Sequence, residues 1–97
     1  MINFPTIIPV GPINYTVVLM PSLTTEEGKV AFGLQKPMEQ ELRINSAAKE
    51  DSQRVTLFHE LIHAVDSLYD LELTEPQIVR LANIIMDTLT RMGRAPW

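Results

Sequence analysis

Hydrophobic and polar positions alternate along the first half of the chain and recur with a helical period along the second half. In the first half, three segments are rich in β-branched and aromatic residues or place apolar side chains at every second position. The polar residues 24–28 separate the first two segments, and Lys36 and Pro37 end the second. The alternation therefore predicts three strands, at Tyr15–Met20, Lys29–Leu34 and Glu41–Asn45.

The second half predicts a first helix from about Asp51 or Ser52 to about Tyr69. Either of the two starting residues can act as its N-cap. At ~100° per residue, a broad apolar face separates from a polar strip that holds both histidines together with Glu60 and Thr56. The apolar face consists of Leu57, Phe58, Leu61, Ile62, Ala64, Val65, Leu68 and Tyr69.

A second helix is expected after Thr74. Thr74 and Gln77 have the spacing of a capping box, and Pro76 falls in the first turn, where its missing N–H has no intrahelical partner to lose. Gly93 is the expected C-cap. The predicted core face of this helix consists of Ile78, Leu81, Ala82, Ile85, Leu89 and Met92.

These elements predict an α+β fold with a small twisted sheet of about three strands, one helix that carries the candidate site, and a C-terminal helix. The 97 residues fit a single domain, with residues 1–12 as an extended N-terminal arm and residues 93–97 as a C-terminal tail. The tail is expected to fray, unless Trp97 docks onto a partner. A content of 45% hydrophobic and 21% charged residues is typical of a soluble globular domain.

Charge and cysteine content narrow the class of function. The net charge of −4 argues against non-specific binding of nucleic acid, which needs clustered Lys and Arg. No apolar run approaches the ~20 residues of a membrane span, and residues 1–12 lack the basic start of a signal peptide, so a cytoplasmic location is expected. The chain has no cysteine, so a bound metal must be held by histidine and carboxylate.

The segment His59-Glu60-Leu61-Ile62-His63 is the strongest chemical signal and contains both histidines of the chain. Histidines four residues apart lie on one face of a helix, so both imidazoles can bind one Zn²⁺ at ~2.0–2.1 Å. Glu60 points about 100° away from His59 and is predicted to act as a general base, which takes a proton from the water that the metal activates. The competing interpretation is a solvated helix face with two surface histidines.

A catalytic zinc site needs a third protein ligand. Glu75 is the leading candidate because it opens the second helix, which a short turn at residues 71–73 brings back beside the first. Favourable interaction with the helix dipole is the competing explanation for a glutamate there. Asp66, three residues beyond His63, is an alternative ligand or a group that orients an imidazole or a neighbouring backbone group. The oxyanion-stabilising group stays open among Tyr69, Tyr15, Arg43 and a backbone N–H, although core packing explains Tyr69 better.

The segment Thr56–Ala64 resembles the active-site helix of small zincin metallopeptidases from phages and mobile elements, of which the IrrE-like peptidases are well-known relatives. The resemblance covers about residues 28–92. It implies a minimal zincin-like metallopeptidase domain, with Glu75 as the acidic ligand that opens the following helix and a strand near Glu41–Asn45 whose edge pairs with an extended peptide. The chain departs from the family in Val65-Asp66, where small residues are frequent, and in lacking the regulatory domain of repressor-cleaving relatives.

The expected function is that of a zinc-dependent endopeptidase of phage type, which acts on a protein or peptide substrate and has no nucleic-acid or membrane partner. The alternatives are a binding or regulatory module that holds zinc without turnover, and a hydrolase of non-peptide amides. The metzincins are excluded because they need a third histidine shortly after this motif. The substrate, the oligomeric state and the identity of the metal in the cell stay open.

Overall fold

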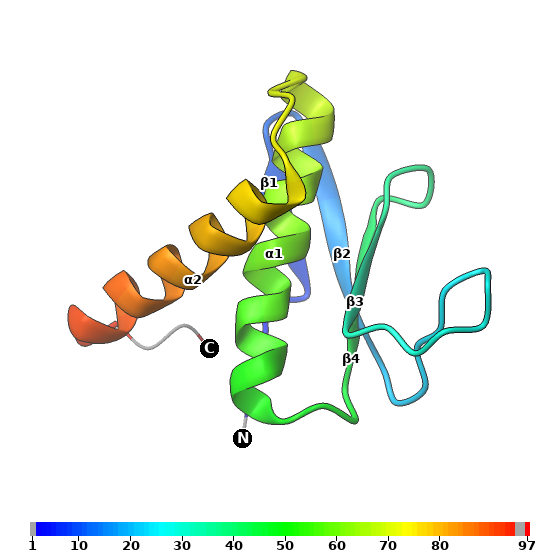
Figure 1. The fold of residues 1–97 in the computed structure, drawn as a ribbon, viewed down its shortest axis with the longest axis horizontal. Helices are drawn as coiled ribbons and strands as arrows, with labels where there is room; N and C mark the ends of the chain where they lie inside the picture. The colour runs from blue at the N-terminus through cyan, green and yellow to red at the C-terminus, as the bar shows by residue number, and fades with distance from the viewer. Residues whose placement is uncertain (1, 95–96) are drawn as a thin grey trace.

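The computed structural model describes residues 2–94 and 97 (Figure 1). The described residues form one four-stranded mixed sheet and two helices, which confirms the predicted α+β class. Among them, neither helix combines the length and apolar character that crossing a membrane requires. The elements are β1 (Ile7–Val10), β2 (Ile13–Met20), β3 (Gly33–Lys36), β4 (Glu41–Asn45), α1 (Glu50–Tyr69) and α2 (Glu75–Arg91).

The strands lie in the order β1-β2-β4-β3. β1 and β2 form an antiparallel hairpin through Gly11, whose φ of 56° suits a tight turn. β2 and β4 run parallel, whereas β3 runs antiparallel to β4 with Gly33 opposite Ile44. β1 and β3 are therefore the edges of the sheet, and β4 is an interior strand.

The sequence located two strands well, misplaced one and missed one. β4 has its predicted bounds, and β2 extends the predicted strand toward Ile13. The prediction of a strand at 29–34 is wrong over most of its length, because Val30 and Phe32 are 82% and 66% exposed and β3 begins only at Gly33. The missed strand, β1, lies in the predicted N-terminal arm. It contains Pro9, which has no backbone N–H to donate, but a proline is tolerated because β1 is an edge strand. Met1 of that arm lies outside the described residues.

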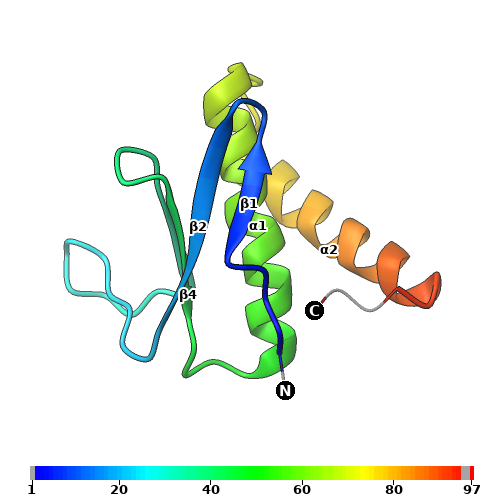
Figure 2. The same cartoon turned by 180° about the vertical axis from the view of Figure 1, so that it is seen from behind.

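The hydrophobic core lies between the sheet and α1. Leu42 and Ile44 of β4 are fully buried, and they belong to one cluster with Leu57 and Ala64 of α1. The period of two along β4 places both of its apolar side chains on the face that α1 covers. Seen from behind, the β1–β2 hairpin crosses in front of α1 (Figure 2). The central strand therefore supports the helix that carries both histidines.

α1 begins earlier than predicted, and the residue before it has no side-chain capping bond. The predicted N-caps, Asp51 and Ser52, therefore lie within the helix. Contacts with the preceding loop fix the start of the helix instead: Gln53 Nε2 donates to the carbonyl oxygens of Ser46 at 3.2 Å and Ala48 at 2.8 Å. These bonds orient α1 as it leaves β4.

α2 begins as predicted. The backbone N–H of Gln77 donates to Thr74 Oγ1 at 3.3 Å, and the N–H of Thr74 donates to Gln77 Oε1 at 2.8 Å, so the capping box is confirmed. At the other end, Gly93 follows the C-cap residue Met92 with a φ of 73°, as a helix-ending glycine does. Both ends of α2 are therefore encoded locally.

The predicted core face of α2 is wrong over most of the helix. Ile78 and Ala82 are buried, but Leu81, Ile85 and Met92 are 39%, 37% and 62% exposed. The reason is that α2 packs against α1 and against no strand, and it points away from the body of the molecule (Figure 1). Its C-terminal half therefore presents apolar side chains to solvent.

Trp97 corrects the prediction of a frayed tail. Its ring centroid lies 5.6 Å from that of Phe4 and 5.0 Å from that of Phe58. Arg54 Nε donates to the Trp97 carbonyl oxygen at 3.3 Å. The described end of the chain is therefore packed against α1 and the N-terminal segment, whereas Ala95 and Pro96 of the predicted tail lie outside the described residues.

Candidate metal centre

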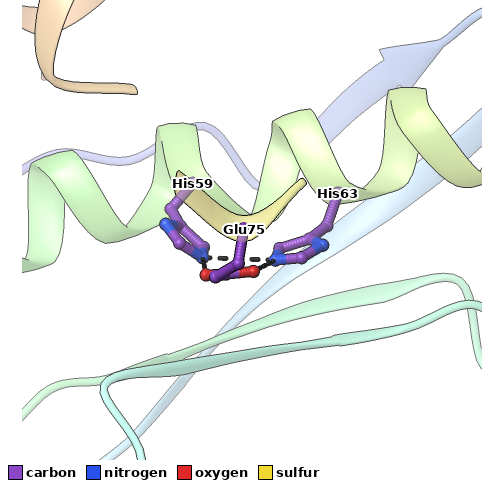
Figure 3. A group of neighbouring side chains, drawn as sticks. All are labelled: His59, His63 and Glu75. Atoms are coloured by element: carbon purple, nitrogen blue, oxygen red, sulfur yellow. Dashed lines mark hydrogen bonds and ion pairs between the residues drawn. The ribbon is translucent and has the colours of Figure 1, made fainter. Parts of the chain in front are cut away.

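His59 and His63 come from successive turns of α1 and point to the same side of it (Figure 3). Their Nε2 atoms lie 3.2 Å apart. Both side chains are partly exposed, at 22% and 30%. The two imidazoles therefore converge on one point that solvent or a ligand can reach.

Glu75, the first residue of α2, places its carboxylate between the two imidazoles (Figure 3). Its Oε1 lies 2.8 Å from His59 Nε2, and its Oε2 lies 3.1 Å from His63 Nε2. The three side chains each offer one ligand atom, all within 4.8 Å of one another. The structure thus brings together the three residues that the sequence singled out as ligands.

The spacing of these atoms fits a tetrahedral zinc site. Bonds of ~2.0–2.1 Å at tetrahedral angles separate ligand atoms by about 3.3 Å. The two histidine nitrogens are 3.2 Å apart, close to that value, and they lie 2.8 and 3.1 Å from different oxygens of the Glu75 carboxylate. Burial, together with the neighbouring His63, lowers the pKa of His59 against the opposing effect of the Glu75 carboxylate, which favours the neutral imidazole that binds metals.

Asp66 lies outside this group and instead holds the connection between the helices. Its Oδ1 accepts a hydrogen bond from the backbone N–H of Leu73 at 3.0 Å. Its carbonyl oxygen accepts a bond from the N–H of Leu71 at 3.3 Å. Asp66 therefore orients the backbone that leads to Glu75, which matches the supporting role that the sequence left open for it.

Glu60 is buried, with 8% of its surface exposed, although the helical pattern placed it in the polar strip. Its carboxylate accepts a hydrogen bond from the backbone N–H of Gln35 in β3. Burial, and secondarily the negative charge of Glu75, raise the pKa of Glu60 to about 7. A carboxyl with a pKa near neutrality suits a general base, because it both ionises and accepts a proton readily at that pH.

Gly33 explains the burial of Glu60, and sequence reasoning did not single it out. A Cβ at this position would lie 2.5 Å from Thr56 Cγ2 and 3.0 Å from Glu60 Cγ. Only glycine therefore lets β3 approach this face of α1 so closely. The position of Gly33 inside a predicted strand is a signal that could have indicated this close approach of β3 to another element.

β3, and not β4, supplies the free sheet edge next to the site, so the expectation of an edge at Glu41–Asn45 is wrong. β4 pairs with β2 on one side and β3 on the other. Asn45 N donates to the Phe32 carbonyl oxygen at 2.8 Å, so by antiparallel alternation the backbone groups of Gly33 and Gln35 point to the free edge. The hydrogen bond from Gln35 to Glu60 lies along that edge.

A cleft of about 320 Å³ adjoins His59 and Glu60. Its walls come from Phe32 and the start of β3, from α1 and from α2, and they are mostly apolar. The lining consists of Phe32, Gly33, Val55, Thr56, His59, Glu60, Val79, Ala82 and Asn83. An apolar side chain bound there would lie beside the candidate metal centre.

The structure does not bring Tyr69 to the centre. A Cβ at Gly11 would collide with the Tyr69 hydroxyl, so this tyrosine covers the β1–β2 turn and is 54% exposed instead of packed in the core. Tyr15 is buried in the core cluster, and Arg43 Nε bonds to Glu41 at 2.8 Å. None of the three side chains belongs to the group formed by the histidines and Glu75.

Comparisons with protein-family models, curated proteins and solved structures give no match to this chain. What the chain can do chemically therefore follows from its own residues. Four predicted site residues meet or adjoin in the structure, namely His59, His63, Glu75 and Glu60. This arrangement can hold a divalent cation with a buried carboxyl next to it.

Proposed function

We propose that the chain is a zinc-dependent endopeptidase of small zincin type. The convergence of His59, His63 and Glu75 within 4.8 Å carries this proposal. A structural zinc site is closed by four protein ligands, whereas three ligands leave a position for water or substrate. The resemblance of residues 56–64 to zincin helices supports the same class, and the lack of cysteine is consistent with action in a reducing cytoplasm.

Each residue has a distinct role in this proposal. His59, His63 and Glu75 would hold the ion, which would supply Lewis-acid polarisation of the scissile carbonyl and of a water molecule. Glu60 takes a proton from that water and delivers it to the leaving amine. The backbone N–H of Gln35 holds the Glu60 carboxylate in place through a hydrogen bond.

A peptide is the substrate that the surroundings favour. Along the free edge of β3 the Gln35 N–H is already bonded to Glu60, but the other outward backbone groups of Gly33 and Gln35 can pair with an extended chain. The cleft next to His59 and Glu60 is lined mostly by apolar side chains and can receive one side chain of that peptide. Together these features favour an extended protein segment over a small non-peptide amide.

Metal content is the first test. Elemental analysis of the purified protein is expected to find about one zinc per chain and to find it lost in Glu75→Ala. Glu39→Ala, which changes an exposed glutamate in the β3–β4 turn, is the matched control and should keep the metal. Wild type that binds no zinc after supplementation would exclude the proposed enzyme.

Turnover is tested with Glu60→Gln, which preserves shape but cannot accept the proton. Wild type should cleave unfolded proteins or a peptide library, with products identified by mass spectrometry, and Glu60→Gln should retain zinc and lose at least 100-fold in rate. A wild type that holds zinc and binds peptides without cleaving them would be a binding module. Cleavage of small amides alone would identify a different hydrolase.

A further inference from the structure

α2 carries an apolar flank that the rest of the described chain leaves open. Leu81, Ile84 and Ile85 are 39%, 60% and 37% exposed. Ile84 and Ile85 lie three and four residues after Leu81, so the three side chains form a continuous surface on one side of the helix. Met92 extends this flank by two turns and is 62% exposed. Contiguous exposed apolar surfaces are typical of sites of protein association.

This flank lies away from the candidate active site. The cleft beside Glu60 uses Val79, Ala82 and Asn83 of α2. At ~100° per residue, Leu81 and Ile84 project from the opposite side of the helix axis. A partner bound to the flank would therefore leave the cleft and the metal ligands open.

The charges along the flank identify the partner. Arg80 and Asp87 lie seven residues apart, which is two helical turns, and border the same side of the flank. Arg80 has no ion-pair partner among the described residues. Asp87 pairs with Arg91 at 3.1 Å, but both side chains are largely exposed, at 62% and 80%, so this pair is weak and free to rearrange.

We infer that α2 pairs antiparallel with α2 of a second copy of this chain. When Leu81 of one copy faces Ile84 of the other, Arg80 of each copy lies beside Asp87 of the other. A two-fold axis between the helices produces both ion pairs at once, as an isologous interface requires. A parallel two-fold arrangement would instead place Arg80 and Asp87 of the two copies on opposite sides of the interface, so neither ion pair could form.

Sedimentation equilibrium over a wide range of protein concentrations tests the apolar part of the interface. Wild type is expected to dimerise reversibly, and Ile84→Glu should weaken the association at least tenfold. Met38→Glu is the matched control, because Met38 is an equally apolar residue, 91% exposed in the β3–β4 turn, and the dimer should persist. A wild type that stays monomeric at every concentration would overturn the inference and leave the flank to a different protein.

Charge reversal tests the antiparallel register. Arg80→Glu and Asp87→Arg should each weaken the homodimer about tenfold, because each creates two like-charge contacts. The double variant Arg80→Glu/Asp87→Arg should dimerise as wild type does, and an equimolar mixture of the two single variants should form a heterodimer. Failure of both restorations would contradict the register, and circular dichroism confirms that each variant is folded.

Discussion

At the scale of single residues, Gly33 controls how close β3 comes to α1. Gly33→Ala is expected to destabilise the fold by about 1–3 kcal/mol, because the new methyl group meets Thr56 Cγ2. Thr56→Ser removes that methyl and should recover part of the loss in the double variant. Urea unfolding of the two single variants and of the double variant measures the coupling free energy between the two positions. Equal losses with and without Thr56→Ser would show that the contact is not the cause.

Glu60 makes the stability of the metal-free protein depend on pH. Its folded pKa of about 7 lies above the ordinary value of 4.5, so between these values the unfolded state binds fewer protons than the folded state. Stability should therefore fall as pH rises from about 4.5 to 7, and the penalty is fully present above pH 7. Glu60→Gln lacks this titration, so with chelator present it should gain on the order of 2–3 kcal/mol over wild type between pH 4.5 and 8.

The control for this pH experiment is Glu39→Gln, which removes an exposed glutamate from the β3–β4 turn. It should follow the wild-type pH dependence. A difference between wild type and Glu60→Gln that stays constant from pH 4.5 to 8 would contradict the raised pKa. The comparison isolates Glu60, because His59, whose pKa is lowered, titrates in both proteins.

The histidine pair and Glu75 were predictable from sequence because their geometry is local. Four residues along a helix fix the spacing of His59 and His63, and the capping box at Thr74 fixes where the helix with Glu75 begins. The burial of Glu60 was not predictable in this way. It depends on a strand far away in sequence, which approaches the helix at Gly33.

At the scale of elements, the connection between α1 and α2 determines where Glu75 lies. Asp66→Ala leaves the Leu73 N–H without its acceptor, so the connection should loosen and zinc affinity should fall about tenfold. The variant should still bind one zinc at saturating metal, because the ligands are intact. Competition with a chelator of known affinity gives the affinity, and Ser67→Ala, an exposed neighbour, is the control. Complete loss of zinc binding would instead indicate that Asp66 is itself a metal ligand.

Strand prediction succeeded where alternation coincided with burial and failed where it did not. In β4, Leu42 and Ile44 alternate and both face the core. Val30 and Phe32 alternate equally well but lie in an exposed excursion before β3. Apolar periodicity reports which residues share a face, whereas the tertiary contacts decide whether anything covers that face.

At the scale of the whole molecule, Trp97 joins the end of the chain to both Phe4 and Phe58. Trp97→Ala should lower the free energy of unfolding by about 2 kcal/mol, less than for a fully buried tryptophan because this ring is only half-buried. Met38→Ala removes an exposed apolar side chain and should change stability little. Thermal or urea unfolding compares the two, and equal effects would show that the aromatic contacts contribute nothing.

The α+β class could be predicted because the two periodicities occupy separate halves of the chain. The strand order could not, because the parallel pairing of β2 with β4 joins segments that no turn signal connects. The open side of α2 also escaped prediction. Its apolar residues have the period of a core helix, and only the whole arrangement shows that α2 packs against α1 alone.

The two helices contribute unequally to the candidate centre, with two ligands on α1 and one on α2. A metal ion bound there would act as a reversible cross-link that closes the loop from His63 to Glu75. The chain has no cysteine that could form a disulfide cross-link instead. Because α2 contacts α1 but no strand, it is the element whose position such a cross-link restrains most. Loss of the ion would therefore loosen the connection at residues 70–74 first and open it to proteases.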